Sequence, residues 1–85
     1  MLPEDFKDAN YVDGFNCPLS KAVRRTFNVD KEIDVAVDYA DVEIRYPEKS
    51  KYFKNNGFNL LKFREVNELF KHNQITTYIT TITEY

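Results

Sequence analysis

The chain has 85 residues, of which 42% are hydrophobic and 15% aromatic, with a formal net charge of −2 and a single cysteine. This length suits one domain, the apolar content argues against disorder, and a lone cysteine excludes an intrachain disulfide and favours a reducing compartment. The N-terminus is acidic, and no stretch approaches the roughly 18 apolar residues of a membrane span. We therefore expect a cytoplasmic protein that makes no membrane contact.

The first 16 residues predict a lead-in arm or a short helix. Pro3 suits the first position of a helix, the acids that follow it favour the helix dipole, and Gly14 would end the segment. A firmer helix is predicted over 18–27, where Pro18 again takes the first position and Asn28 provides the stop. The apolar face of this helix is formed by Leu19, Ala22, Val23, Thr26 and Phe27.

The stretch from Ile33 to Tyr46 carries the clearest pattern in the chain. Apolar and polar residues alternate over 33–38 and over 42–46, which predicts two half-buried strands. The phase of the alternation changes at Tyr39–Asp41, which indicates a tight turn or a bulge, although a single bent strand also fits. Acids outnumber bases between Asp30 and Glu48, so we expect the solvent side of these strands to be acidic.

The second half of the chain predicts a helix between two further strands. Residues 51–54 suit a short optional strand, and Asn59 is a sound N-cap for a helix that runs to about Lys71. The tail over 74–85 is dense in Ile, Thr and Tyr and lacks Gly and Pro, which predicts a C-terminal strand. Its apolar residues occupy both sides of that strand, so a bulge or a partner on each side is expected.

These elements predict the α+β class, in a single domain over 1–85 with the order α-β-β-(β)-α-β. The economical packing is a three- to four-stranded, mostly antiparallel sheet with two helices on one face.

No arrangement of residues predicts catalysis, a cofactor or a bound metal. His72 is the only histidine and has no Cys or second His to complete a ligand set. Cys17 precedes a helix N-terminus, where the dipole lowers the pKa of a thiol, but nothing in the sequence brings a base to it. A thiol enzyme is therefore a minor alternative, and we expect a non-enzymatic protein.

Two sets of charged and aromatic residues are candidates for binding. The acids lack the glycine of a calcium loop, so they indicate a solvated face that discourages edge pairing or a face that binds a protein. The candidate protein-binding residues are Asp34, Asp38, Asp41, Glu43, Tyr78 and Tyr85. The candidate nucleic-acid-binding residues, which could meet phosphate, are Lys21, Arg24, Arg25, Lys49, Lys51 and Lys54.

The leading hypothesis is a small protein-interaction protein whose partner is itself or a host protein. The C-terminal strand could add to a neighbouring chain, giving a homodimer or a contact within a larger assembly. The Lys, Asn, Tyr and Ile usage is frequent among bacteriophage and mobile-element products, so an inhibitor or a structural component of that kind is one concrete version. Nucleic-acid binding through the basic residues is the alternative.

Overall fold

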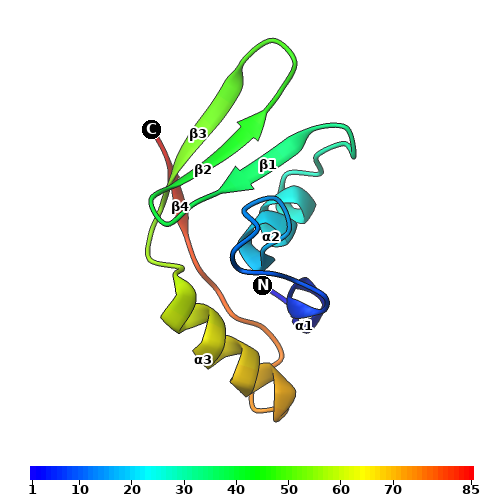
Figure 1. Ribbon diagram of the computed structural model, residues 1–85, viewed down its shortest axis with the longest axis vertical. Coiled ribbons are helices and arrows are strands. Elements are labelled where there is room, and N and C mark those ends of the chain that lie inside the picture. Colours follow the sequence, from blue (N-terminus) through cyan, green and yellow to red (C-terminus); the bar gives the residue numbers. More distant parts are fainter.

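The computed structural model describes all 85 residues as three helices and a four-stranded sheet. The elements in chain order are α1 (Pro3–Phe6), α2 (Pro18–Thr26), β1 (Asp34–Val37), β2 (Asp41–Arg45), β3 (Ser50–Asn55), α3 (Leu60–Lys71) and β4 (Ile82–Glu84). The strands lie in the order β1-β2-β3-β4 and every neighbouring pair is antiparallel (Figure 1). The predicted α+β class and antiparallel sheet are confirmed, and the optional third strand is present.

The alternating stretch forms a β-hairpin rather than one bent strand. Val35 lies opposite Ile44 and Val37 opposite Val42 in the β1–β2 ladder. The connecting turn is held by the Asp38 carboxylate, whose Oδ1 accepts hydrogen bonds from two backbone amides at 2.8 and 2.7 Å. The inward side chains of Val35, Val42 and Ile44 are fully buried at the centre of the core, and Val37 is partly buried against them.

Helix α2 lies against the sheet at β1. The Sγ of Cys17 caps the helix by accepting from the amide of Ser20 at 3.4 Å, and Pro18 takes the first position as predicted. The Ser20 hydroxyl donates to the Val35 carbonyl at 2.8 Å, which fixes the helix to the strand. Asn28 adopts a left-handed conformation with φ 51° and ends the element.

Helix α3 packs against α1 and extends beyond the sheet (Figure 1). Asn59 caps it as predicted, because its Oδ1 accepts from the amide of Lys62 at 3.0 Å. The phenyl ring of Phe6 in α1 lies 5.2 Å from the ring of Phe70 and 6.4 Å from that of Phe58. The short N-terminal helix therefore brings an aromatic side chain into the core between α3 and the rest of the domain.

The C-terminal strand is shorter than predicted. Only Ile82–Glu84 pairs with β3, because β3 ends at Asn55 and the chain then turns towards α3. Just before β4, Thr81 contacts Asn56 beyond the end of β3, because the Asn56 amide donates to the Thr81 carbonyl at 3.4 Å and the Asn56 Nδ2 donates to the Thr81 hydroxyl at 3.2 Å. Further upstream the tail runs beside the first residue of the chain, where the Tyr78 amide donates to the Met1 carbonyl at 2.9 Å.

The projection of α3 makes the molecule elongated, with principal extents of 42 × 23 × 20 Å. Even α3, which is the longest helix at 12 residues, lacks the length and the apolar character needed to cross a membrane.

Replacing Phe58 with alanine should remove most of the stability of the domain. Its side chain is fully buried between the sheet and α1, and truncating a buried Phe costs about 3–5 kcal/mol. Urea denaturation of Phe58→Ala is the measurement, with Leu61→Ala as the control because Leu61 is 73% exposed. The control should change the free energy of unfolding by no more than about 0.5 kcal/mol. A loss below about 1 kcal/mol in Phe58→Ala would contradict this packing.

Candidate functional site

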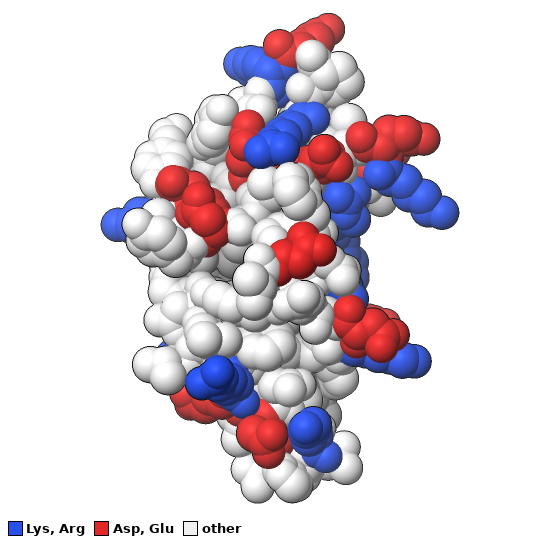
Figure 2. All heavy atoms as spheres, in the orientation of Figure 1, with Lys and Arg blue, Asp and Glu red and all other residues white.

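The outer face of the sheet carries bases as well as the predicted acids. The register places Asp34 opposite Arg45 and Asp41 opposite Lys54, so each of these carboxylates has a base as its cross-strand neighbour. Glu43 lies between an alanine of β1 and a tyrosine of β3. In Figure 2 acidic and basic side chains are interspersed over the visible face. The expectation of an acidic face therefore holds for β1 and β2 alone and not for the whole sheet.

Most of the predicted acids already have hydrogen-bond donors within the chain. The Glu43 carboxylate accepts from the Ser50 hydroxyl at 2.6 Å and from the Arg45 Nε at 3.0 Å, and these two contacts hold its pKa below the ordinary value. The Tyr85 hydroxyl donates to the Asp41 carboxylate, which raises the pKa of that tyrosine. A partner that docked on this face would have to compete with these internal donors.

A hollow of about 290 Å³ lies on the same face. Asp41 and Glu43 line one part of it, while Phe15 and Tyr52 supply aromatic walls. Carboxylates beside aromatic rings can hold a cation. Here the chain supplies that cation itself, because the Arg45 guanidinium lies 5.3 Å from the centre of the Phe15 ring.

The structure does not gather the predicted protein-binding residues into one site. Tyr85 lies on the outer face with Asp41, whereas the backbone of Tyr78 pairs with Met1 elsewhere on the tail. Asp38 serves the β1–β2 turn. The sequence prediction assigned these residues to two features, the acidic sheet face and the C-terminal strand, and the structure places Tyr85 beside the first and Tyr78 away from it.

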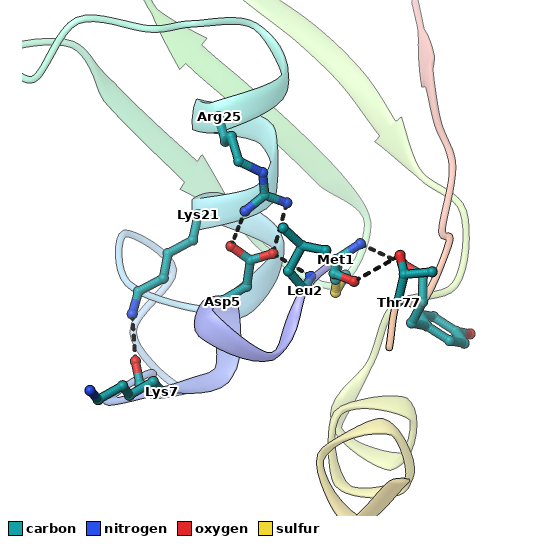
Figure 3. Close-up of polar contacts among 8 residues, drawn as sticks. Met1, Leu2, Asp5, Lys7, Lys21, Arg25 and Thr77 are labelled. Carbon is teal, nitrogen blue, oxygen red and sulfur yellow. Dashed lines mark hydrogen bonds and ion pairs between the residues drawn. The ribbon is translucent and has the colours of Figure 1, made fainter. Parts of the chain in front are cut away.

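The basic side chains of α2 are engaged within the chain. Arg25 forms a two-pronged ion pair with the buried Asp5, with one contact at 2.9 Å, and the Lys21 Nζ donates to the Lys7 carbonyl at 2.8 Å (Figure 3). The hydrogen bond to Asp5 raises the pKa of Arg25. Arg24 donates to the carbonyl of Asp30 at 3.1 Å.

The lysines of the second basic group lie away from α2. Lys54 stands opposite Asp41 on the outer face, and Lys51 pairs with Glu84 of β4 at 3.4 Å. Lys49 lies in the loop between β2 and β3. The two predicted basic groups therefore do not form one phosphate-binding surface.

Cys17 and His72 do not form a catalytic pair. The thiol is 1% exposed, and burial raises its pKa, which lowers the thiolate fraction. His72 lies at the end of α3, where its exposed ring is 3.3 Å from the Glu68 carboxylate. No group of three or more His, Cys, Asp or Glu side chains is placed to hold a metal ion.

The two edges of the sheet differ in how they are protected. At β1 the Val37 amide donates to the Gly14 carbonyl at 2.9 Å, and the Val35 carbonyl accepts from Ser20. A side chain at Gly14 would overlap the Val37 carbonyl, so the glycine permits this close approach. The N-terminal loop and α2 therefore close the β1 edge.

The β4 edge is open over Thr80–Glu84. The Tyr85 amide donates to the Tyr52 carbonyl of β3 at 3.2 Å. The odd-numbered residues of this segment therefore make the backbone hydrogen bonds to β3. Because hydrogen-bonding directions alternate along an antiparallel strand, the backbone groups of Ile82 and Glu84 point away from β3. The backbone of Thr80 makes no hydrogen bond within the chain.

The N-terminus already occupies the upstream end of this edge. Tyr78 shares the parity of Ile82, and residues 77–81 contain no bend or turn. The Tyr78 amide donates to the Met1 carbonyl, and the Met1 ammonium donates to the Tyr78 carbonyl. Burial lowers the pKa of that ammonium. At Tyr78 the outward backbone groups are therefore already paired, whereas those of Thr80, Ile82 and Glu84 are not.

An apolar groove of about 240 Å³ lies beside the open edge, between α2 and the tail. Its lining includes Leu19 and Val23 from α2, Phe27 directly after that helix, and Ile79 and Ile82 from the tail. Ile79 is 81% exposed and Phe27 is 42% exposed, so apolar side chains at this groove meet solvent. Sequence reasoning missed the groove because it depends on where α2 lies relative to the tail. The available signal was the absence of charge from Gln74 to Thr83.

Comparison of the chain with known protein families, with curated proteins and with solved structures found no match. Support for a function therefore has to come from the surfaces of the chain and their chemistry.

Replacing Ser50 with alanine should raise the pKa of Glu43 towards its ordinary value of 4.5. The Ser50 hydroxyl is the largest cause of the lowered pKa, and Ser50→Thr keeps a hydroxyl as the matched control. A carboxyl whose pKa is lower in the folded state stabilises the fold above its unfolded pKa, and that stabilisation disappears as pH falls through the folded pKa. The destabilisation by Ser50→Ala should therefore be present at neutral pH and shrink in acid.

An NMR titration of the Glu43 carboxyl carbon measures both variants and the wild-type chain. An unchanged Glu43 pKa in Ser50→Ala would show that the hydroxyl contact does not hold the carboxylate.

Proposed function

We propose that this chain is a non-enzymatic protein-interaction domain that takes an extended segment of a partner as a fifth strand at β4. The observation that carries the proposal is the run of unpaired backbone groups at Thr80, Ile82 and Glu84 beside an apolar groove. Strand addition of this kind draws affinity from main-chain hydrogen bonds and specificity from pockets for alternate side chains.

The groove suits the side chains of such a strand. A partner residue directly opposite Ile82 would project to the same face of the sheet, because paired residues share a face. That face carries the groove, which Ile82 itself lines. An apolar side chain at that partner position would leave water and pack against Ile82 and Phe27, and each fully buried aliphatic side chain contributes about 1.5–3 kcal/mol.

The composition of the tail also supports pairing at this edge. Natural edge strands are usually protected by charged side chains, proline, bulges or covering loops. The tail contains no charged residue from Gln74 to Thr83 and no proline, and it bears the exposed Ile79. The β1 edge, in contrast, is covered. An uncovered edge whose one charged side chain, Glu84, is paired with Lys51 of its own sheet is the feature expected of a surface that pairs.

The other sites predicted from the sequence have less support for binding. The acids of the outer face are hydrogen-bonded internally, and the basic side chains of α2 contact their own chain. Neither observation favours a nucleic acid or a charged partner over strand addition. The sequence hypothesis used both the acidic sheet face and the C-terminal strand, and the proposal keeps only the strand.

Thr80→Pro should abolish capture of extended peptides while leaving the sheet intact. Proline removes only the Thr80 amide, which points away from β3, and proline is tolerated on the free side of an edge strand. Thr80→Val is the matched control, because it keeps the amide and a β-branched side chain. Peptides selected from a random displayed library on the wild-type chain should bind Thr80→Val within about threefold and Thr80→Pro at least about tenfold more weakly.

NMR chemical shifts give the location of the bound peptide and confirm that each variant is folded. Changes should fall on 79–84 and on the α2 residues of the groove. Equal binding by Thr80→Pro, or shift changes centred on Asp41 and Glu43, would contradict the proposal.

A further inference from the structure

We infer that the strand added at β4 is the β4 strand of a second copy of this chain, antiparallel and centred on Ile82. The inference rests on the proposed function, because it names the partner of the same edge. Three features support it: the backbone groups of β4 that have no partner, the side chains that a two-fold axis would bring together, and the covered edge at β1.

The open backbone groups favour one register. Because Met1 occupies Tyr78, the free groups belong to Thr80, Ile82 and Glu84. An axis at Ile82 pairs this residue with the partner's Ile82 and pairs Thr80 with the partner's Glu84, so every open residue meets an open residue. A two-fold axis at Thr81 would instead pair Glu84 with the partner's Tyr78, whose backbone amide and carbonyl already bond to Met1 of its own copy.

The side chains in that register are compatible on both faces of the sheet. On the outer face Thr81 lies opposite the partner's Thr83, and threonine pairs across strands are favourable. On the inner face the two isoleucines meet, and Glu84 lies opposite a threonine rather than another acid. Lys51 also pairs with Glu84 within each copy at 3.4 Å, so no unpaired like charges oppose the contact.

The two-fold axis brings the two grooves together. Ile82 lines the groove of its own copy and would contact the partner's Ile82 at the mouth of the partner's groove. The exposed side chain of Phe27 also lines this groove and would be shielded from water. A contact that uses the same patch on both copies is the usual form of a two-fold dimer.

The covered β1 edge ends the assembly at two copies. Pairing through β4 leaves a β1 edge at each end of the combined sheet, where Gly14 and Ser20 already occupy the outward groups of Val37 and Val35. No further strand can add there without displacing them. The assembly is thus a closed dimer with a continuous eight-stranded sheet rather than a filament.

Sedimentation velocity from micromolar to millimolar concentration tests the association. The wild-type chain and Thr80→Val should reach the mass of a dimer. Thr80→Pro should dissociate at least about a hundredfold more readily, because the two-fold axis removes the amide twice and each loss weakens the contact about tenfold. NMR spectra of Thr80→Pro in dilute solution check that the variant is folded.

Cysteine cross-linking tests the register. Under mild oxidation Ile82→Cys should give a covalent dimer, since residues opposite each other in a hydrogen-bonded pair lie about 5.5 Å apart between Cα atoms, within disulfide range. Thr80→Cys alone should not, because its counterpart is displaced by four residues, about 13 Å. A mixture of Thr80→Cys with Glu84→Cys should cross-link. The wild-type chain is the control for Cys17, whose thiol is buried.

Each outcome decides between this inference and the proposed function. A dimer that Thr80→Pro weakens and Ile82→Cys traps supports both. A monomer at millimolar concentration, or a dimer insensitive to Thr80→Pro, overturns the second-copy partner. If such a chain still selects peptides that Thr80→Pro fails to bind, the edge takes a different protein and the proposed function stands. If it selects none, both fail.

Discussion

The structure depends on the pairing of β4 with β3, which returns the tail to the sheet after α3 has left it. That pairing places the tail beside Met1 on one side and beside Asn55 and Asn56 of the β3 end on the other. The main-chain groups of an antiparallel strand point alternately to its two sides, so pairing on one side presents a row of donors and acceptors on the other. The β4 edge and its groove are direct consequences of this constraint.

Several charged side chains outside this edge are engaged by contacts within the chain. Asp5 holds Arg25, Ser50 holds Glu43, and Asp41 holds Tyr85. The contacts of Asp5 and Asp41 join segments distant in sequence, so several charged residues that look available in the sequence serve the fold. The proposed binding surface instead uses main-chain groups and exposed apolar side chains, which a search for charged motifs does not detect.

Local patterns predicted the local structure well. The alternation over 33–46 located the hairpin, and Pro18 and Asn59 marked the starts of both long helices within one residue, because these signals act over a few neighbouring positions. The predicted bounds of the C-terminal strand were wrong, since they depend on contacts between residues far apart in sequence. The apolar groove likewise required the position of α2 relative to the tail.

Backbone amide exchange in dilute solution tests the central claim, an open β4 edge, most directly. The amides of Thr83 and Tyr85 face β3 and should exchange slowly, whereas those of Ile82 and Glu84 face outward and should exchange at nearly the rate of an unfolded chain. An alternating pattern of this kind is the predicted result. Equal protection of all four amides in the dilute monomer would show that the edge is covered and would contradict the account.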